Sequence, residues 1–204
     1  MKAADISCAI LAGGRSTRFG GVSKAYAIVG GRRIIDRITG VAAGIFQEVI
    51  IVTNDIKGFS DFQRFKFVCD LYAGAGPVAG IHAALSISEA ESVFVVAADM
   101  PFIDAEIVQM QIDFFRAQAE ADTVIPETSD GKEPLHGIYR RSVLPVLEEM
   151  LQRKPGFPVL ALLDHINSVC FQPALSEKVK ISFFNINTPA DLVKAEEIAV
   201  RYRL

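Results

Sequence analysis

The sequence predicts a three-layer α/β fold, in which a mostly parallel central sheet carries helices on both faces. Three observations predict it. Apolar runs of strand length alternate with segments of helical pattern from residue 7 to beyond residue 104. Two of these runs, residues 49–53 and 93–98, contain almost no polar side chains, as is typical of central strands buried on both sides. Neither a linker nor an internal repeat is evident, so we expect one domain over residues 1–204.

The predicted elements follow one another in a regular order. A strand at residues 7–12 precedes a helix over residues 34–45, and the strand at 49–53 precedes a helix from about Gly80. The strand at 93–98 leads to a helix from Asp104, which we expect to be its N-cap. Further along, the pattern predicts a strand at 122–126, a turn at 129–131, a segment at 136–140 and a helix from Ser142.

The last helix has the clearest local signal. Thr188 can cap its N-terminus, Pro189 suits the first helical position, and Asp191 can reach back to the cap. In contrast, we expect Tyr139, Arg140 and Arg141 to form a solvated start to a helix.

Composition limits the classes of function. The net charge of −3 and pI of about 5.7 give no general attraction to nucleic acid or to anionic lipid. The three cysteines are odd in number and have apolar neighbours, which argues against disulfides or a zinc site and favours a reducing compartment. The N-terminus does not resemble a signal peptide, and no apolar run is long enough to span a membrane. We therefore expect a soluble cytoplasmic protein.

A glycine-rich basic loop follows the first strand. Gly13 and Gly14 can turn their amides toward an anion, while Arg15, Arg18 and Lys24 supply positive charge suited to a polyphosphate. At the carboxyl edge of a parallel sheet, such a loop is a candidate ligand site, although a solvated basic turn would account for the same residues. The spacing fits neither a Walker A loop nor a dinucleotide fingerprint.

Polar side chains also follow other predicted strands. Asp99 ends a buried strand, where its carboxylate could hold Mg²⁺ or form a turn before Pro101. Asn54 and Asp70 follow two neighbouring strands, and each could contact a base or ribose or serve as a turn residue.

Four segments resemble the molybdenum cofactor guanylyltransferases. The first is LAGGRSTRFGGVSK at residues 11–24, a signature loop of nucleotidyltransferases; Phe19 departs from the methionine that is frequent there. The others are GPVAGI at 76–81, ADMPFI at 98–103 and FNINTPADL at 184–192. The resemblance runs from residue 6 to about 195 and is weakest over 120–180, where EPLHGIY at 133–139 is an intermediate match.

This resemblance implies a Rossmann-like nucleotidyltransferase fold and the transfer of GMP from GTP to the phosphate of molybdopterin, with release of pyrophosphate. It implies Mg²⁺ as cofactor, held by Asp99, and makes Arg18, Lys24 and Asp99 the expected catalytic residues. The expected nucleotide-binding residues are Leu11, Ala12, Gly13, Gly14, Lys24, Asn54, Asp70, Gly80 and Asp99. Asn185, Asn187 and His136 are the expected acceptor-side residues, although a lone histidine beside apolar neighbours is more often packed or at the surface.

Three other functions remain to be compared with this one. The same kind of enzyme could use CTP, or a sugar or polyol phosphate acceptor, and the glycine loop does not separate these substrates. A noncatalytic nucleotide-binding protein could keep the same loop. A nicotinamide-dependent oxidoreductase is disfavoured by the glycine spacing. Molybdoenzyme maturation proteins are the protein partners that the resemblance suggests.

Overall fold

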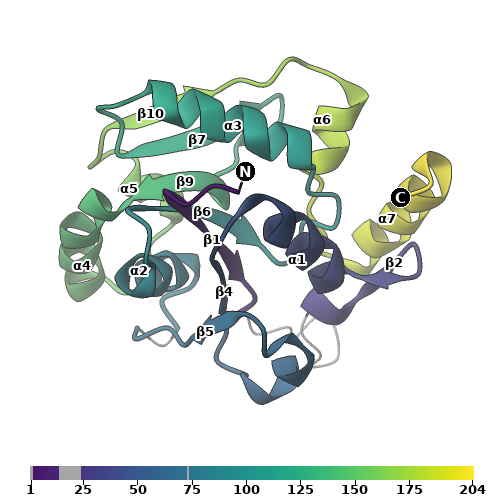
Figure 1. Ribbon diagram of the computed structural model, residues 1–204, viewed down its shortest axis with the longest axis horizontal. Helices are drawn as coiled ribbons and strands as arrows, with labels where there is room; N and C mark the ends of the chain where they lie inside the picture. Colours follow the sequence, from purple (N-terminus) through teal and green to yellow (C-terminus); the bar gives the residue numbers. More distant parts are fainter. Residues whose placement is uncertain (1, 14–23, 73) are drawn as a thin grey trace.

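The computed structural model describes residues 2–13, 24–72 and 74–204, and its centre is an eight-stranded sheet within that part of the chain. Seven of the strands lie in the order β10-β7-β9-β6-β1-β4-β5, which Figure 1 shows from top to bottom, and β8 pairs with β7. The strands are β1 (Ile6–Leu11), β4 (Val49–Val52), β5 (Lys66–Val68), β6 (Ser92–Ala97), β7 (Thr123–Thr128), β8 (Gly131–Lys132), β9 (His136–Arg140) and β10 (Ser168–Phe171).

Most strand pairs are parallel, as predicted. β1 pairs in parallel with both β4 and β6, β4 pairs in parallel with β5, and β10 pairs in parallel with β7. The exceptions are β9, which runs antiparallel between β6 and β7, and the short β8, which pairs antiparallel with β7. A separate short hairpin, β2 (Ile28–Val29) and β3 (Arg32–Arg33), lies outside the main sheet.

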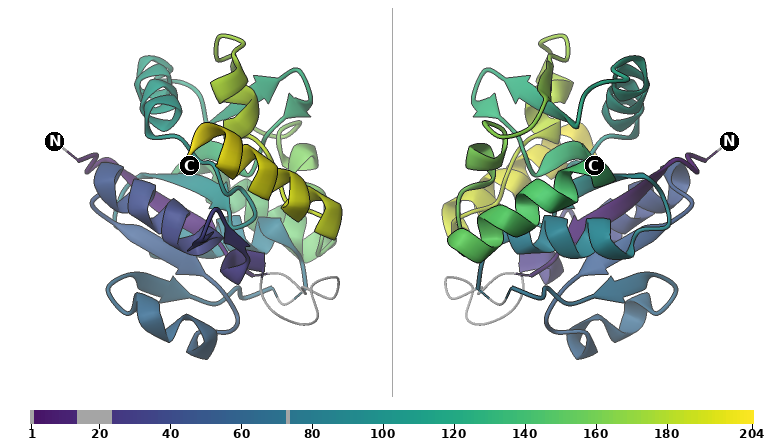
Figure 2. Two further views of the ribbon diagram at one scale, coloured as in Figure 1. Left: turned by 90° about the vertical axis from the view of Figure 1, so that its right-hand side faces the viewer. Right: turned by 90° about the vertical axis from the view of Figure 1, so that its left-hand side faces the viewer.

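Helices cover both faces of the sheet, so the molecule has three layers. One face carries α1 (Ile34–Ile45), α3 (Ala105–Ala117), α6 (Glu177–Ser182) and α7 (Pro189–Tyr202). The other carries α2 (Pro77–Ile87), α4 (Leu144–Arg153) and α5 (Val159–Leu162). Figure 2 presents these two faces in turn, with α1 and α7 foremost on the left and α2 and α4 on the right. Three short 3₁₀ helices complete the described part: η2 (Lys24–Tyr26), η3 (Lys57–Phe62) and η4 (Arg141–Val143).

The central strands are apolar because each of their sides faces a layer of helices. In β6, Phe94 and Val96 pack toward α1 and α3, whereas Val93 and Val95 pack toward α2 and α4. All four side chains are fully buried. Successive side chains of a strand point to opposite faces, so a strand covered on both sides has no position for a solvated residue.

Local capping signals are confirmed at two helices. The Asp104 side chain accepts hydrogen bonds from the amides of Glu106 and Ile107 at the start of α3. At the start of α7, Thr188 and Asp191 form a reciprocal capping box, and Pro189 is the first helical residue.

The expectation of a solvated helix start at residues 139–141 is wrong. Tyr139 is fully buried in β9, and its hydroxyl donates to the carbonyl of Pro134 at 2.7 Å. Arg141 donates to the carbonyls of Leu85, Ser88 and Ala90, at distances from 2.7 to 3.0 Å. It thereby satisfies carbonyls around the C-terminus of α2, which have no partners within that helix. A polar side chain with such an internal role cannot be distinguished from a solvated one by local pattern.

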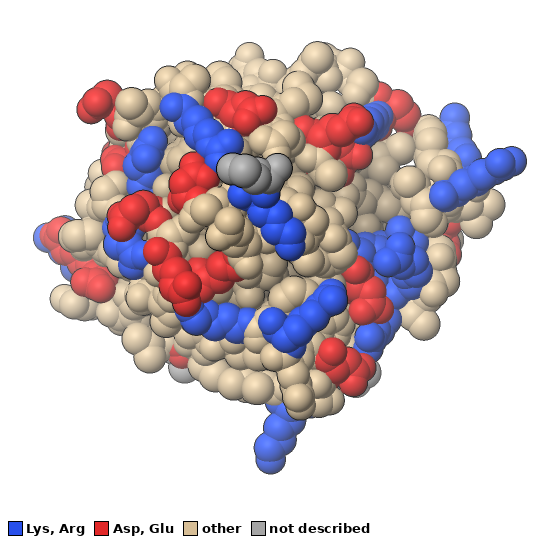
Figure 3. Space-filling view, viewed as in Figure 1, with Lys and Arg blue, Asp and Glu red and all other residues tan. Residues whose placement is uncertain are grey.

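The surface charge is mixed. On the face in Figure 3, the described Lys and Arg side chains are interspersed with Asp and Glu, so this face offers no extended basic surface to a polyanion. Within residues 2–13, 24–72 and 74–204, no helix combines the length and apolar character needed to cross a bilayer.

Candidate functional site

The carboxyl ends of β1, β4 and β6 bring the predicted site residues to one edge of the sheet. Beyond the end of β1, the amide of Ala12 donates to the carbonyl of Val52 at 2.9 Å, and the carbonyl of Leu11 accepts from the amide of Ala98 at 3.1 Å. Ala12 is buried by these contacts, whereas the following Gly13 is exposed. The chain therefore leaves β1 between its two neighbouring strands, and the end of β1 is bonded to Ala98, the residue that precedes Asp99.

Lys24 joins three distant parts of the chain at this edge. It begins η2, and its Nζ lies 3.7 Å from Oδ2 of Asp99. The same ammonium group donates to the carbonyl of Ile186 at 2.9 Å and to Oδ1 of Asn187 at 3.3 Å. The amide of Ile186 in turn donates to the carbonyl of Asp99 at 2.9 Å. The predicted lysine and acid do converge, and the segment before α7 completes their surroundings. Gly14 and Arg18, which we expected at this site, lie outside the described residues.

Asp99 is a partly buried acid with incomplete charge compensation. Its side chain is 25% exposed, and that of Lys24 is 23% exposed. Burial raises the pKa of Asp99, and the nearby Lys24 opposes this shift without cancelling it. A buried carboxylate of this kind is stabilised by a further cation, and carboxylate oxygen is a hard ligand of the type that Mg²⁺ prefers. The residues present therefore fit the implied Mg²⁺.

Asn54 and Asp70 bond to one another. The Asn54 amide Nδ2 donates to Oδ2 of Asp70 at 3.0 Å, and the backbone amide of Asp70 donates to Oδ1 of Asn54 at 3.2 Å. These two bonds connect the loops that follow β4 and β5. In the described part of the chain, the buried Oδ1 of Asp70 has no hydrogen-bond partner. This unsatisfied acceptor is consistent with a ligand contact, which stays a prediction for both residues.

A tight turn precedes α2, which begins at Pro77, three residues before the expected start near Gly80. Gly76 is the N-cap with φ of 74°, a conformation that favours glycine, and Pro77 follows as the first helical residue. Gly80 is buried, and a Cβ atom there would lie 3.0 Å from Cδ2 of Leu11 and 3.6 Å from Cγ1 of Val52. The close approach at Gly80 is thus between α2 and the sheet, while its predicted nucleotide contact stays a prediction.

Of the three expected acceptor-side residues, His136 does not lie at the site surface. It is fully buried in β9, where its Nδ1 is 3.1 Å from Oε1 of Gln111 and its ring packs edge-on against Phe94 and Phe183. The expectation of an acceptor contact is corrected here, because the core surrounds this imidazole. Asn185 is partly exposed and Asn187 is exposed, and both lie next to Ile186 at the site.

Glu133 is the site residue to which the sequence assigned no role. It follows β8, its carboxyl group is partly buried, and burial raises its pKa, with smaller contributions from the negative charges of Asp130 and Asp99. Hydrogen bonding from the side chain of Asn185 opposes that shift. The one available signal was its place in the segment EPLHGIY, which resembles the guanylyltransferases.

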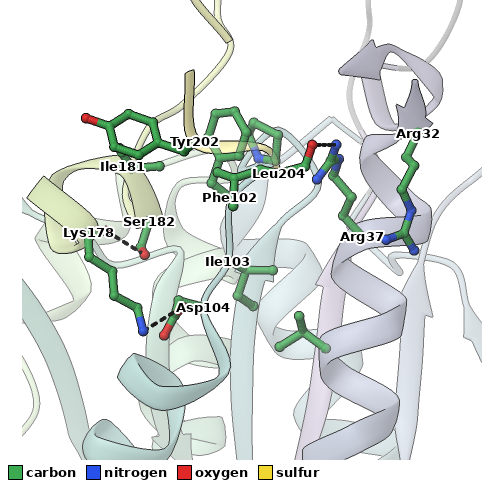
Figure 4. Close-up of a pocket in the computed structure, with 12 residues that line it drawn as sticks. Arg32, Arg37, Phe102, Ile103, Asp104, Lys178, Ile181, Ser182, Tyr202 and Leu204 are labelled. Carbon is green, nitrogen blue, oxygen red and sulfur yellow. Dashed lines mark hydrogen bonds and ion pairs between the residues drawn. The ribbon is translucent and has the colours of Figure 1, made fainter. Parts of the chain in front are cut away.

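A separate hollow of about 390 Å³ lies away from these residues (Figure 4). It is bounded by α1, α6, α7 and the loop after Asp99, and includes Arg37, Phe102, Lys178 and Leu204. Arg37 donates to the carbonyl of Leu204, and Lys178 pairs with Asp104, so these charges are engaged within the protein. Lys24 and Asp99 are not among the lining residues, and we therefore place the candidate site at the sheet edge.

A parallel sheet edge with an exposed glycine, a lysine and a partly buried acid defines an α/β protein with a candidate site for a phosphorylated ligand and its metal. Comparison with known proteins makes the class more specific. The model of the MobA-like NTP transferase domain matches residues 8–167, and the chain belongs to this family.

Individual relatives agree with this assignment. The "Probable molybdenum cofactor guanylyltransferase" of Pelotomaculum thermopropionicum is 36% identical over 95% of this chain and 93% of its own length. The "Molybdenum cofactor guanylyltransferase" of Desulfosudis oleivorans is 32% identical, with 92% of each chain covered. The crystal structure of molybdopterin-guanine dinucleotide biosynthesis protein A from Archaeoglobus fulgidus superposes with a TM-score of 0.79 at 33% identity, covering 96% of this chain and 99% of the other. The predicted family and fold class are confirmed.

Proposed function

We propose that this protein transfers GMP from GTP to the terminal phosphate of molybdopterin and releases pyrophosphate. The observation that carries the proposal is the convergence of Lys24, Asp99 and the segment around Asn187 at the carboxyl edge of the sheet. Membership of the MobA-like family and the names of its relatives support the choice of substrates.

The reaction needs no covalent intermediate with the protein. An oxygen of the acceptor phosphate attacks the α-phosphorus of GTP, the bond from that phosphorus to the bridging oxygen breaks, and pyrophosphate leaves with the bond's electron pair. Negative charge on the phosphates is the principal obstacle, so catalysis depends on positioning and electrostatic stabilisation. Lys24 is placed to neutralise phosphate charge, and Gly13 is exposed where its backbone can approach the nucleotide.

Asp99 would hold Mg²⁺, which when bound polarises phosphate oxygens and offsets their charge. The bonds between Asn54 and Asp70 would keep these two side chains preorganised toward the nucleoside. We also expect Arg18 and the Gly14 amide to take part, as the sequence predicts.

The decisive experiment is an incubation of the protein with labelled GTP, Mg²⁺ and purified molybdopterin. We expect equal amounts of pyrophosphate and of a nucleotide–pterin adduct. Parallel reactions with CTP, and with sugar or polyol phosphates, test the related transferase functions. Tight binding of GTP without pyrophosphate release in the presence of the acceptor would instead identify a noncatalytic nucleotide-binding protein.

We further propose that the protein acts in the cytoplasm, where GTP is available and its free cysteines, Cys8, Cys69 and Cys170, would stay reduced. Molybdoenzyme maturation proteins are proposed as the recipients of the product. Neither nucleic acid nor a membrane is a proposed partner.

A further inference from the structure

The 3₁₀ helix η2 supplies Lys24 to the site and consists of a single turn. A 3₁₀ helix has three residues per turn, so its three side chains point in three different directions. Lys24 reaches Asp99, whereas Ala25 is buried and offers only a methyl group to the core. Tyr26 extends toward η3. The lysine side chain is long and flexible, so its direction depends on how firmly η2 itself is held.

Tyr26 attaches η2 to η3 through both its hydroxyl and its ring. The hydroxyl donates a hydrogen bond to the carbonyl of Gly58, and the centre of the ring lies 5.0 Å from that of Phe59. Because Phe59 is fully buried, the tyrosine ring packs against a neighbour that the core holds in place. Tyr26 thereby joins the turn that carries Lys24 to the segment between β4 and β5.

Arg33 supports this junction from the N-terminus of α1, where it is the N-cap residue. Its Nε and Nη2 donate to the two carboxylate oxygens of Asp36 at 2.7 and 3.1 Å, and its Nη1 donates to Asp61 at 3.0 Å. The guanidinium carbon lies 5.5 Å from the centre of the Tyr26 ring and 5.3 Å from that of Phe62, within the range of cation–π attraction. Arg33 therefore links α1 to η3 and lies over the ring that joins η3 to η2.

The start of η3 is in turn bonded to the loop that carries Asn54. The amide of Asp55 donates to Oγ1 of the buried Thr53 at 3.1 Å, and the amide of Gly58 donates to Oδ1 of Asp55 at 3.1 Å. Gly58 is also the residue whose carbonyl accepts from Tyr26. A continuous series of contacts therefore connects the expected nucleoside loop with η2.

We propose that Tyr26 is a positioning residue that holds η2 against η3 and thereby directs Lys24 toward the phosphates of the nucleotide. The inference rests on the proposed function, in which Lys24 neutralises phosphate charge. A displacement of about 1 Å at a reacting group can cost about a hundredfold in rate, so a weakened attachment of η2 lowers turnover while the lysine is still present. Arg33 still holds η3 to α1 when Tyr26 is replaced, so the loop of Asn54 keeps its place.

The kinetic test compares Tyr26→Phe, Tyr26→Ala and Lys24→Ala at saturating substrates. Tyr26→Phe loses one hydrogen bond and should lower kcat about threefold to tenfold. Tyr26→Ala also loses the ring and should lower kcat about thirtyfold. Tyr202→Phe removes a hydroxyl that donates to Glu177, away from the site, and is the matched control, with kcat expected at the wild-type value.

The double variant separates positioning from a general structural role. Lys24→Ala should lower kcat about a hundredfold, as expected for the loss of one preorganised charge contact. Adding Tyr26→Ala should then have less than about a twofold further effect, because Tyr26 acts through the lysine.

A binding measurement tests the same role without the transfer reaction. GTP and guanosine differ only in the triphosphate, so the ratio of their dissociation constants reports what the phosphate contacts contribute. At constant Mg²⁺, the affinity for GTP should fall about tenfold in both Tyr26→Ala and Lys24→Ala, while the affinity for guanosine stays within about twofold of the wild type. If Tyr26→Ala does not fold, Tyr26→Phe takes its place, with an expected loss of about threefold for GTP alone.

Three outcomes overturn the inference: wild-type turnover in Tyr26→Ala, an equal loss of affinity for GTP and guanosine, or additive effects in the double variant. If the wild-type protein binds GTP but forms no pterin adduct, the proposed function fails, and the ratio of the two dissociation constants still decides the role of Tyr26. If the wild type is active and Tyr26→Ala matches it, the inference about Tyr26 fails alone.

Discussion

Asp99 and Lys24 contact each other across 75 positions of sequence, and burial disfavours the charge of the acid. Burial raises the pKa of Asp99, which means that the folded protein stabilises its ionised form less well than water does. Active sites commonly contain groups of this kind, because a charge that is poorly compensated in the free protein is compensated when substrate or metal binds. Removing the acid should therefore affect activity much more than stability.

We expect Asp99→Asn to lower turnover by about a hundredfold or more, the usual effect of losing one preorganised charge contact. The melting temperature should stay near that of the wild type or rise, because Asn retains the shape of the side chain without its buried charge. Turnover with saturating GTP and Mg²⁺, together with thermal unfolding, checks both statements. Asp113→Asn, on the exposed side of α3, is the control. Full activity in Asp99→Asn would remove the proposed metal ligand.

His136 illustrates a buried titratable group that belongs to the core. Burial lowers its pKa from 6.5 to about 4, so the neutral imidazole is the form that the folded state accommodates. As pH falls below 6.5, the unfolded chain binds a proton that the folded protein does not, and stability decreases until the pH reaches the folded pKa.

The prediction concerns the pH dependence of unfolding in His136→Gln. Between pH 6.5 and 5, the wild type should lose about 1.6 kcal/mol more stability than the variant, because the unfolded histidine goes from half protonated to almost fully protonated while the folded one stays mostly neutral. Urea denaturation at both pH values measures this difference, and comparison of the two proteins cancels the contribution of other groups. Parallel pH profiles would show that His136 is protonated in the folded state.

At the scale of single elements, the site depends on how closely α2 approaches β1. Gly80 allows this contact, since a Cβ there would lie 3.0 Å from Cδ2 of Leu11, a residue that leads into the glycine loop. Gly40, in the exposed middle of α1, has open space around the same position. Packing therefore requires glycine at position 80, whereas nothing in the packing requires glycine at position 40.

Alanine substitutions at the two positions test this difference. Gly80→Ala should destabilise the protein by about 1–2 kcal/mol, because Leu11 or the helix must shift. Gly40→Ala should stabilise it by about 0.5–1 kcal/mol through helix propensity alone. Urea unfolding of both variants provides the measurement, and GTP binding should weaken in Gly80→Ala alone. A higher free energy of unfolding in Gly80→Ala would show that Leu11 and the sheet can shift to accommodate the methyl group without a loss of stability.

Local patterns predict those elements whose burial is complete or whose caps are explicit. The strand at β6 and the capping box of α7 depend on adjacent residues, and both were predicted. The hairpin of β2 and β3 has two residues in each strand, too few for a period to emerge. The burial of His136 depends on Gln111 from α3 and Phe183 from the segment after α6. Long-range packing of this kind leaves no mark in the neighbouring sequence.

At the scale of the whole molecule, the sheet topology joins the beginning and end of the chain at the site. Lys24 precedes most of the fold, whereas Ile186 and Asn187 lie just before its last helix, and the three are held together by bonds of 2.9 and 3.3 Å. Ligand binding at this junction is therefore coupled to global folding and not to one local loop. The resemblance predicts that Lys24 and Asp99 converge. The hydrogen bond from Lys24 to the carbonyl of Ile186 could be found only in the tertiary structure.

This coupling predicts thermal stabilisation by the nucleotide. At a hundred times its Kd, a ligand that binds the folded state adds about 2.7 kcal/mol of stability, which for a chain of this size corresponds to a rise of about 5–10 °C in Tm. We expect GTP with Mg²⁺ to produce this shift, and CTP, ATP and UTP at the same concentration to produce smaller ones. In Asp99→Asn most of the Mg²⁺-dependent part should disappear, while the Asp113→Asn control should keep it. Equal shifts with all four nucleotides would show that the site recognises the triphosphate without the base, and the preference for guanine would then have to arise during transfer.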